Sequence, residues 1–299
     1  MAFDLNLLRS ERLYRNSAPV SVVMADLGRL RAIDAEMEEK KKSWNGRGRA
    51  FAALAALFFV GALITPVGPV GAGMSAVSFV AMVVCFIVAA RYSGLDLENR
   101  RYELVARILQ RLRKDIAPDE PVAVELDFRP TQDARYLTKR GKVKDWNAES
   151  FAQRWLSFQV RLRDGTHLRL GMEERLQARS RTRRNPRGKY KTKRKQKGVS
   201  FLHVHLRVKP ERHPQLARLG AQARQAVRLP QGASLSRLDV AEDRLALRVG
   251  MARDWAAQEG VKPPFCDAPR AALMSLLSLY QVLNYSTALR KREPARASS

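Results

Sequence analysis

The longest feature in the hydropathy pattern is an uncharged apolar run over residues 50–90. A helix crosses a membrane's hydrocarbon core with about 20 apolar residues, so this run is about twice the length of one crossing. Thr65–Pro69 and Gly71–Gly73 interrupt it, because proline lacks a backbone donor and glycine costs backbone entropy. The pattern predicts a transmembrane hairpin over 47–92. Its two helices are expected near Arg47–Pro66 and Gly71–Arg91.

Two alternatives to a double crossing stay open: a re-entrant hairpin that enters the membrane without crossing it, and a hairpin buried in a soluble core. Both flanks of the run are basic, with Lys40–Lys42 before it and Arg100–Arg101 after it, whereas the turn has no charge. Basic flanks stay on the cytoplasmic side. We therefore expect a multi-pass membrane protein with both termini cytoplasmic. A secretory signal is not expected, because the run begins late and is too long.

Residues 1–46 are predicted to form an N-terminal cytoplasmic helical segment. Ser17 is a candidate N-cap, with Pro19 in the first turn. Apolar residues then recur at three- and four-residue steps, which is typical of an amphipathic helix. They are Val20, Val23, Leu27, Leu30 and Met37. Such a helix would pack on the cytoplasmic domain or on its own copy in a homo-oligomer.

From residue 93 to 292 the pattern indicates a cytoplasmic α+β domain, with packed helices on an antiparallel sheet. The period first changes to two in Pro121–Arg129, where apolar and charged residues alternate as in a strand with one buried face. A hairpin follows over 155–172, with Asp164-Gly165 as its two-residue turn. Residues 130–150 show no clear pattern.

Further elements complete the domain: a helix over Pro214–Arg228, a hairpin around Glu242-Asp243, and a short polar helix around Trp255. A last helix is expected to be capped by Asp267 and to pack on the apolar face of the sheet. Because residues 271–289 carry no charge, a third membrane segment over 268–290 is the alternative. Residues 293–299 are expected to be a disordered tail.

The strongest charge pattern lies within residues 175–198, which we call the basic ribbon. No acidic residue occurs between Arg175 and Pro210, and basic residues alternate with others on both sides of Asn185-Pro186-Arg187-Gly188. That tetrapeptide suits a type I turn with glycine in a left-handed bulge. The pattern predicts a long β-hairpin, and a disordered polybasic loop between two shorter strands is the alternative.

The hairpin's register can be predicted from its turn. A three-residue Pro-Arg-Gly loop pairs Leu170 with Val204 and Leu168 with Leu206, so that apolar side chains meet at the base. The same register places Arg179, Arg181 and Arg183 opposite Lys195, Lys193 and Lys191. Like charges in direct opposition destabilise a sheet by about a few tenths of a kcal/mol per pair. Such a ribbon is best explained if an anion lies against it.

Composition agrees with an anionic partner. The chain of 299 residues has 55 Lys and Arg against 29 Asp and Glu, a formal net charge of +26. This excess attracts polyanions such as nucleic acid or anionic lipid. Its two cysteines, Cys85 and Cys266, suit neither a disulfide framework nor a metal site and agree with a reducing compartment.

We therefore predict an anion-binding site on the basic ribbon and a secondary basic face on the neighbouring strands. The anion-binding residues are Arg179, Arg181, Arg183, Arg187, Lys189, Lys191, Lys193, Lys195 and Lys197. The secondary face comprises Arg161, Arg163, Arg169, His203, His205 and Arg207.

The sequence contains no recognisable catalytic motif: neither a glycine-rich phosphate loop nor a nucleophile elbow nor metal-ligand spacing. His203 and His205 are expected to be polar-face residues and not metal ligands. Glu125 and Asp127 are expected to balance Arg161, Arg163 or Arg169 across the sheet. No catalytic residue, cofactor or metal is predicted.

The prediction is a non-enzymatic two-pass membrane protein whose basic cytoplasmic domain binds phospholipid headgroups or another polyanion. One alternative is a structural subunit of a membrane assembly, with the basic ribbon docked on an acidic protein. The other is a membrane-tethered nucleic-acid-binding protein, although base recognition needs stacking aromatics and Tyr190 is the one aromatic residue within the ribbon.

Overall fold

The structure is a computed structural model that describes residues 8, 10–64, 68–93, 97–184, 186, 188–258 and 265–297, with residues 93 and 291–297 by their backbone only. The chain forms two compact units. The sheet unit comprises Met1–Asp26 and Arg100–Ser299, and the helical unit comprises Leu27–Asn99.

The helical unit is built from two helices, α2 (Val20–Ile64) and α3 (Gly68–Ser93). A break between two helices is confirmed, since α2 ends at Ile64 and α3 begins at Gly68; residues 65–67 lie outside the described part. Gly71–Gly73 do not interrupt the helix as predicted, because α3 already includes them, with Pro69 tolerated in its first turn. However, α2 is one helix of 45 residues, whereas we expected a separate amphipathic helix before the membrane segment. The intervening Glu, Lys and Arg residues favour helix, and Gly46 and Gly48 each cost only about 1 kcal/mol.

Small residues let α2 and α3 approach closely. A Cβ added to Gly48 would lie 3.2 Å from the Phe86 ring, and one added to Gly71 would lie 3.0 Å from the Ala62 side chain. The Ser75 hydroxyl donates to the carbonyl of Ala55 at 3.0 Å. Glycine, alanine and serine at such positions are typical of helix pairs held by close backbone packing.

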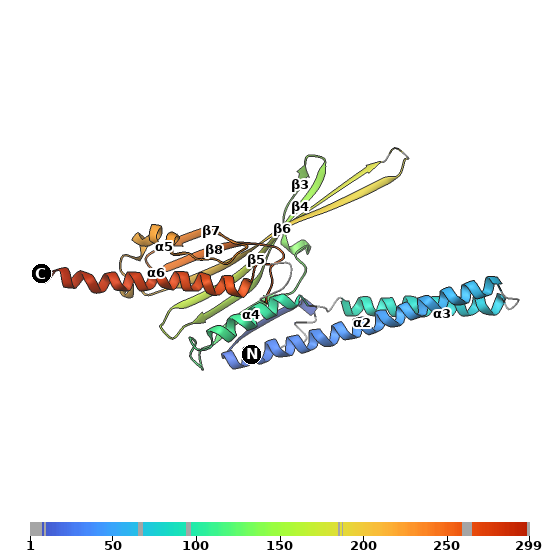
Figure 1. The fold of residues 1–299 in the computed structure, drawn as a ribbon, viewed down its shortest axis with the longest axis horizontal. Helices are drawn as coiled ribbons and strands as arrows, with labels where there is room; N and C mark the ends of the chain where they lie inside the picture. The colour runs from blue at the N-terminus through green and yellow to red at the C-terminus, as the bar shows by residue number, and fades with distance from the viewer. Residues whose placement is uncertain are drawn as a thin grey trace. The chain divides into compact units, whose positions relative to one another are not determined.

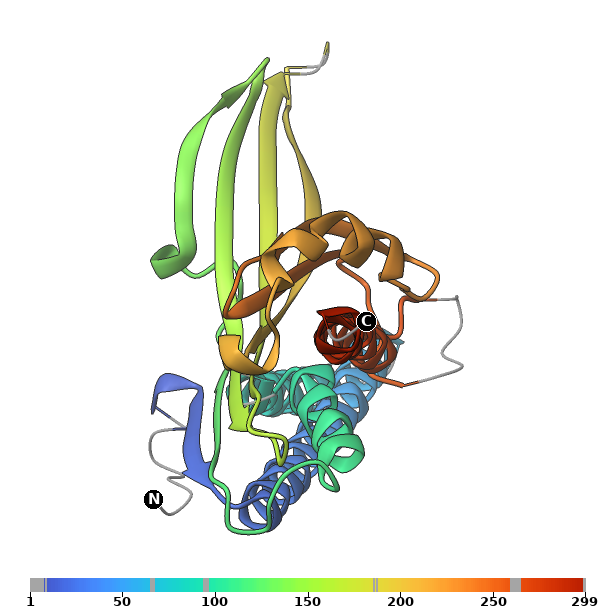
Figure 2. The same ribbon diagram turned by 90° about the vertical axis from the view of Figure 1, so that its left-hand side faces the viewer.

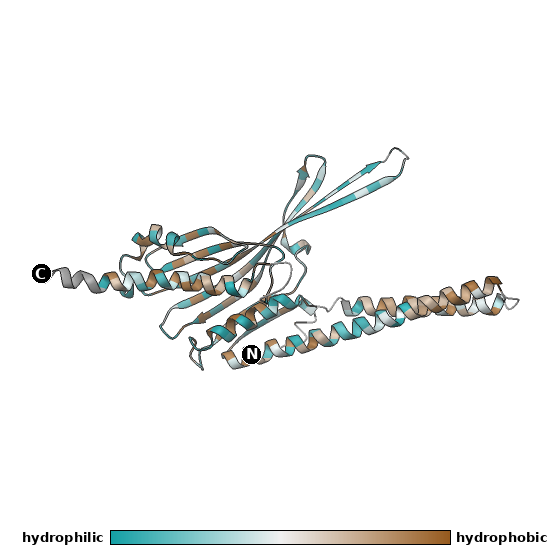
Figure 3. Cartoon of the chain, in the orientation of Figure 1, coloured by the Kyte–Doolittle hydropathy of each residue, from teal (hydrophilic) through white to brown (hydrophobic). Residues whose placement is uncertain are grey.

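Both helices are long and apolar enough to cross a membrane. Their most apolar stretches are coloured toward the hydrophobic end of the scale in Figure 3, yet only 11% and 17% of these stretches are buried. Large side chains such as Leu57, Ile64 and Val77 are more than 60% exposed. An unburied apolar surface of this kind is expected where lipid replaces water as the solvent.

The sheet unit has an eight-stranded sheet in the order β1-β2-β4-β5-β6-β8-β7, with β3 paired to β4. All neighbouring strands pair antiparallel, so the α+β prediction with an antiparallel sheet is confirmed. The strands are β1 (Leu13–Ala18), β2 (Val122–Asp127), β3 (Leu137–Val143), β4 (Trp146–Arg161), β5 (His167–Arg184), β6 (Tyr190–Arg207), β7 (Ala233–Val240) and β8 (Arg244–Ala252).

One face of this sheet forms the core. Leu168, Leu206 and Leu245 from adjacent strands are fully buried there. Helices α4 (Asn99–Leu112) and α6 (Ala268–Ala297) lie on this side (Figure 2). The short helices are η1 (Ala134–Tyr136), η2 (Pro210–Arg212), η3 (Leu216–Leu219) and α5 (Gly220–Ala226).

The C-terminal helix packs as predicted. The Asp267 carboxylate accepts from the Arg270 backbone N–H at 2.9 Å, which is an N-cap bond. Ala271, Leu279 and Leu283 of α6 are buried, and α6 is not among the described helices apolar enough to span a membrane. The expected disordered tail is helical up to Ala297, because the alanine- and arginine-rich end continues to favour helix.

Several local predictions are corrected. Ser17 lies in β1, not at a helix N-cap, and Trp255 follows β8 without helix. The unplaced residues 130–150 form η1, β3 and the start of β4. The 155–172 hairpin closes with a three-residue loop, because Leu162 and Thr166 are hydrogen bonded around it. Gly165 takes the left-handed conformation there, at φ 86°, so the loop is a bulge-type turn.

Candidate anion-binding face

The second face of the sheet carries nearly all the predicted site residues. The predicted register is confirmed: Leu170 pairs with Val204, and Arg179, Arg181 and Arg183 pair with Lys195, Lys193 and Lys191. β5 and β6 keep this register without a shift from His167↔Arg207 to Arg184↔Tyr190. Since directly paired residues share a face, the ribbon cations and the secondary basic residues of β5 and β6 lie on one face. We call it the open face.

The basic ribbon is a projecting β-hairpin and not a disordered loop. β6 pairs with β8 only as far as Val199, and β4 pairs with β5 only as far as Asn147↔Ser180. The ends of β5 and β6 therefore extend past the rest of the sheet (Figure 1), and their surface is strongly hydrophilic (Figure 3). Gly188 has φ 81°, as the predicted bulge requires. Arg187 and Asn185 lie outside the described residues.

Most ribbon cations on the open face have no acidic partner. Lys191, Lys193 and Lys197 are exposed and form no ion pair or hydrogen bond with any described side chain. Arg179 bonds the neutral Gln177 side chain at 2.8 and 2.5 Å. The ribbon therefore presents concentrated positive charge to the solvent; Lys189 belongs to it and lies directly before β6.

Two residues that sequence reasoning missed contact the ribbon from the start of β4. The Asp145 carboxylate lies 3.4 Å from Arg181 and 3.0 Å from Arg183. The Trp146 ring lies 5.3 Å from the Arg181 guanidinium and 5.4 Å from the Lys195 amine. The contact places an aromatic side chain beside the ribbon cations, whereas Tyr190 pairs with Arg184 and lies on the other face of the ribbon. These residues belong to the stretch with no clear pattern, so no signal in the sequence pointed to them.

At the opposite end of the same strands, basic residues form a cross-strand row. Arg161 of β4 pairs with His167 of β5, His167 pairs with Arg207 of β6, and Arg207 pairs with Arg244 of β8. Arg169 follows on β5, two residues along the same face. Arg163 does not join them: it lies in the turn, and its Nε points to the carbonyl of Ile116 at 3.4 Å.

A third group surrounds Glu173 near the middle of the open face. Its carboxylate lies 2.5 Å from Arg175, 3.3 Å from His203 and 3.8 Å from Arg248. Burial raises the pKa of Glu173, but the Arg175 hydrogen bond and the nearby positive charges outweigh burial and lower it overall. Arg175 and Arg248 also lie over the Phe201 ring, at 5.3 and 3.8 Å.

The two predicted histidines contribute little charge at neutral pH. Burial lowers the pKa of His203, and so does Arg248, against the opposing effect of Glu173. Burial also lowers the pKa of His205, assisted by Arg244 and Arg169, while Asp239 opposes the shift. Both rings are therefore mainly uncharged at pH 7.

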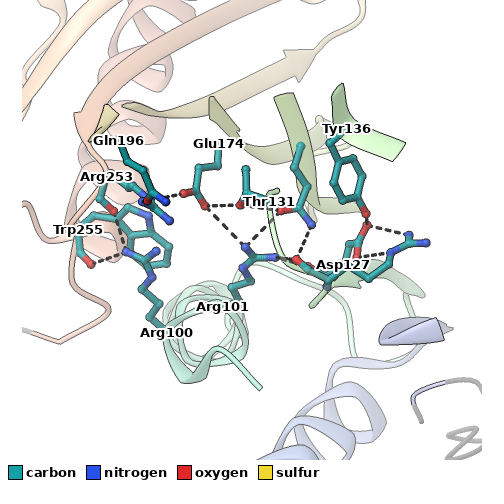
Figure 4. A network of polar contacts seen from close by, with 11 residues as sticks. Arg100, Arg101, Asp127, Thr131, Tyr136, Glu174, Gln196, Arg253 and Trp255 are labelled. Atoms are coloured by element: carbon teal, nitrogen blue, oxygen red, sulfur yellow. Dashed lines mark hydrogen bonds and ion pairs between the residues drawn. The ribbon is translucent and has the colours of Figure 1, made fainter. Parts of the chain in front are cut away.

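A buried polar network ties the base of the ribbon to α4 (Figure 4). The Glu174 carboxylate accepts from Arg253 Nε at 2.7 Å and from the Thr131 hydroxyl at 3.1 Å, and lies 3.6 Å from Arg101 Nη2. Arg101 and Glu174 are both only 3% exposed. Arg253 also reaches Gln196 of the ribbon at 3.3 Å.

Arginine–tryptophan packing completes this network. The Trp155 and Trp255 rings stack at 5.7 Å and 5°. Arg101 lies 5.1 Å from the Trp155 ring, and Arg100 lies 4.6 Å from the Trp255 ring. Arg101 also donates to the Asp127 carbonyl and, at 3.3 Å, to Gln153. These contacts fix the sheet at the point where the ribbon begins to project.

The acidic pair of β2 has different partners from those predicted. Glu125 pairs with Arg15 of β1 at 2.9 Å, and Asp127 pairs with Arg129 at 2.8 Å and accepts from the Tyr136 hydroxyl. The predicted partners were wrong because Arg15 of β1, a strand that the sequence pattern did not predict, pairs with Glu125, and Arg129, two residues along the chain, pairs with Asp127. Within the described residues, no three His, Cys, Asp or Glu side chains gather as a metal site.

Compared with protein-family models, curated proteins and solved structures, the chain gives no match.

Proposed function

We propose that this chain is a non-enzymatic, two-pass membrane protein that holds a polyanion-binding sheet domain at the membrane surface. In this proposal α2 and α3 cross the bilayer, both termini are cytoplasmic, and the open face with its basic ribbon binds an anionic surface. Phospholipid headgroups are the favoured ligand, because the tether keeps the domain at high effective concentration beside them.

The observation that carries the proposal is the ribbon's register. It aligns Arg179, Arg181 and Arg183 with Lys195, Lys193 and Lys191 on one face, where Asp145 is the one carboxylate paired with them among the described residues. Such a surface repels itself in isolation and gains electrostatic energy when an anion lies against it. A basic residue near an anionic membrane contributes about 1 kcal/mol, so these six contribute at most about 6 kcal/mol, or about 10⁴-fold in affinity.

The test uses the full chain in neutral-lipid nanodiscs, mixed with fluorescent vesicles over a salt series. One vesicle set contains phosphatidylserine, a second contains only phosphatidylcholine, and a DNA duplex forms a third arm. In the ribbon variant, Arg179, Arg181, Arg183, Lys191, Lys193 and Lys195 are all changed to Ser. A matched control variant removes six exposed cations from the helical side of the sheet unit: Arg111, Arg113, Lys114, Arg218, Arg224 and Arg270.

We expect the parent and the matched control to bind phosphatidylserine vesicles, and the ribbon variant to lose at least tenfold in affinity. Equal losses in both variants would attribute binding to net charge and refute a ribbon site. Preferential duplex binding with a slope of about −0.9 per phosphate contact would instead select the nucleic-acid alternative. No binding by the parent at 150 mM salt would refute the proposal and leave the assembly-subunit role.

A further inference from the structure

A second, discrete anion site lies at the end of the open face remote from the ribbon. The cross-strand row of Arg161, His167, Arg207 and Arg244 brings four basic side chains together from four adjacent strands. Neighbouring strands are about 4.8 Å apart, so the row spans about 14 Å. Residues 169 and 181 are about 40 Å apart along an extended strand, so this row is separate from the ribbon.

Arg161, His167 and Arg207 of this row border a concavity, whereas Arg244 is not part of its lining. The concavity has a volume of about 800 Å³, and its lining includes the basic residues Arg161, His167, Arg169, Arg207 and Lys209 and the acidic residues Glu211 and Asp243. Its walls come from the Gly165 turn and from the Pro210–Glu211 segment of η2. Positively charged side chains from three strands and a loop therefore converge on one volume of small-molecule size. We call it the basin.

The basin's cations are largely unpartnered. Arg207 Nε lies 3.7 Å from Asp243. Arg161, Arg169 and Lys209 form no side-chain hydrogen bond or ion pair with the residues that the structure describes. Arg161 and Arg169 have no acidic partner among the described residues, whereas Arg207 has Asp243, so positive charge still exceeds negative charge around the basin. Each guanidinium group is a planar donor that matches phosphate oxygens in pairs. A membrane contact alone would not require an enclosing wall.

We propose that the basin binds a compact anion carrying two or more phosphate groups, either a soluble polyphosphate or the phosphorylated headgroup of a lipid. Arg161 and Arg207 would each contact a phosphate by paired N–H donors, and Arg169 and Lys209 would supply further charge. This inference deepens the proposed function, since it assigns a ligand class to one part of the open face. It does not depend on ribbon binding.

Isothermal titration of the full chain in neutral nanodiscs with inorganic tripolyphosphate tests the site directly. We expect saturable binding with one ligand per chain, reduced at least tenfold in R161S/R207S and changed by less than twofold in the six-residue ribbon variant. Hydrogen exchange in the parent should show protection by tripolyphosphate at residues 167–169 and 207–211. A second measurement uses phosphatidylcholine vesicles with 5% phosphatidylinositol bisphosphate. Vesicle binding that tripolyphosphate displaces would indicate a lipid headgroup as the ligand, and absence of vesicle binding would indicate a soluble polyphosphate.

The charge-retaining variant R161K/R207K guards against misfolding, because it keeps the net charge and removes the guanidinium forks. We expect it to bind tripolyphosphate several-fold more weakly than the parent while melting at the same temperature. Parent-like binding by both double variants would overturn the basin assignment, as would equal loss in the ribbon variant. Failure of phosphatidylserine binding with intact tripolyphosphate binding would refute the proposed function alone. Intact phosphatidylserine binding without tripolyphosphate binding would refute the basin assignment alone.

Discussion

The ion pair of Arg101 and Glu174 allows a quantitative test of how the ribbon is anchored. Both side chains are 3% exposed, and removing one partner of a buried pair costs about 3–5 kcal/mol because the other charge stays buried. In E174Q, Arg101 keeps the Asp127 carbonyl and Gln153 as acceptors. The expected loss of unfolding free energy in E174Q is therefore at the lower end of this range, about 3 kcal/mol. It corresponds to a melting temperature about 6–12 °C lower for a unit of this size.

The reciprocal variant should behave differently. In R101M the Glu174 carboxylate remains paired with Arg253 at 2.7 Å, so we expect a loss of about 2 kcal/mol, mainly from carbonyls left without donors. The double variant R101M/E174Q should lose less than the sum of the two, because neither charge is then buried alone. The expected coupling energy is about 1–2 kcal/mol.

Equilibrium urea unfolding of the full chain in detergent micelles measures these values. Tryptophan fluorescence is a suitable signal, since Trp155 and Trp255 stack within the network. The control E149Q breaks the exposed Arg140–Glu149 pair and should cost no more than about 0.5 kcal/mol. Additivity of the two single variants within about 0.5 kcal/mol would show that the pair is not coupled. A loss in E174Q as small as in E149Q would refute the burial argument itself.

Three further predictions concern other parts of the sheet unit. A Cβ at Gly198 would lie 2.7 Å from Arg253 Cδ, so G198A should lower the unfolding free energy, measured in urea, by about 1–3 kcal/mol. An equal loss in an R253A background would contradict this steric explanation. Burial raises the pKa of Asp127, but hydrogen bonds from Arg129 and Tyr136 outweigh it and lower the pKa overall. The stabilisation is therefore complete above the unfolded-state value of about 3.9 and is lost as pH falls through the lower folded value. As the pH falls from 4 to 2, the unfolding free energy should decline less steeply in D127N than in the parent. Parallel declines would refute the contribution assigned to Asp127. Burial, assisted by Arg244 and Arg169, lowers the pKa of His205. An anion in the basin should offset the contribution of the two arginines, so tripolyphosphate binding at pH 6.5 should take up protons, and fewer protons in H205Q. Calorimetry in two buffers measures the proton uptake, and unchanged uptake in H205Q would contradict this prediction.

Patterns that repeat within one segment were predictable from the sequence. The alternation in residues 168–208 together with the Asn-Pro-Arg-Gly turn determined the β5–β6 register residue by residue, because a one-residue slip would expose every apolar side chain. The Asp267 cap and the interrupted apolar hairpin are equally local. The sequence also indicated that Glu174 is unusual, because it occupies an inward position in an otherwise apolar row. It did not indicate which residues pair with Glu174.

Those partners come from distant parts of the chain and were decided by tertiary structure. Arg101 and Arg253 reach Glu174 from α4 and from the end of β8, and Trp146 reaches the ribbon from a stretch without periodicity. The basin depends on the β4–β5 and β5–β6 pairings together with Pro210, Glu211 and Asp243, which come from outside these strands. Periodicity shows which face a residue occupies, but not which other strand lies beside it, because that choice depends on how apolar faces from the whole chain are buried together.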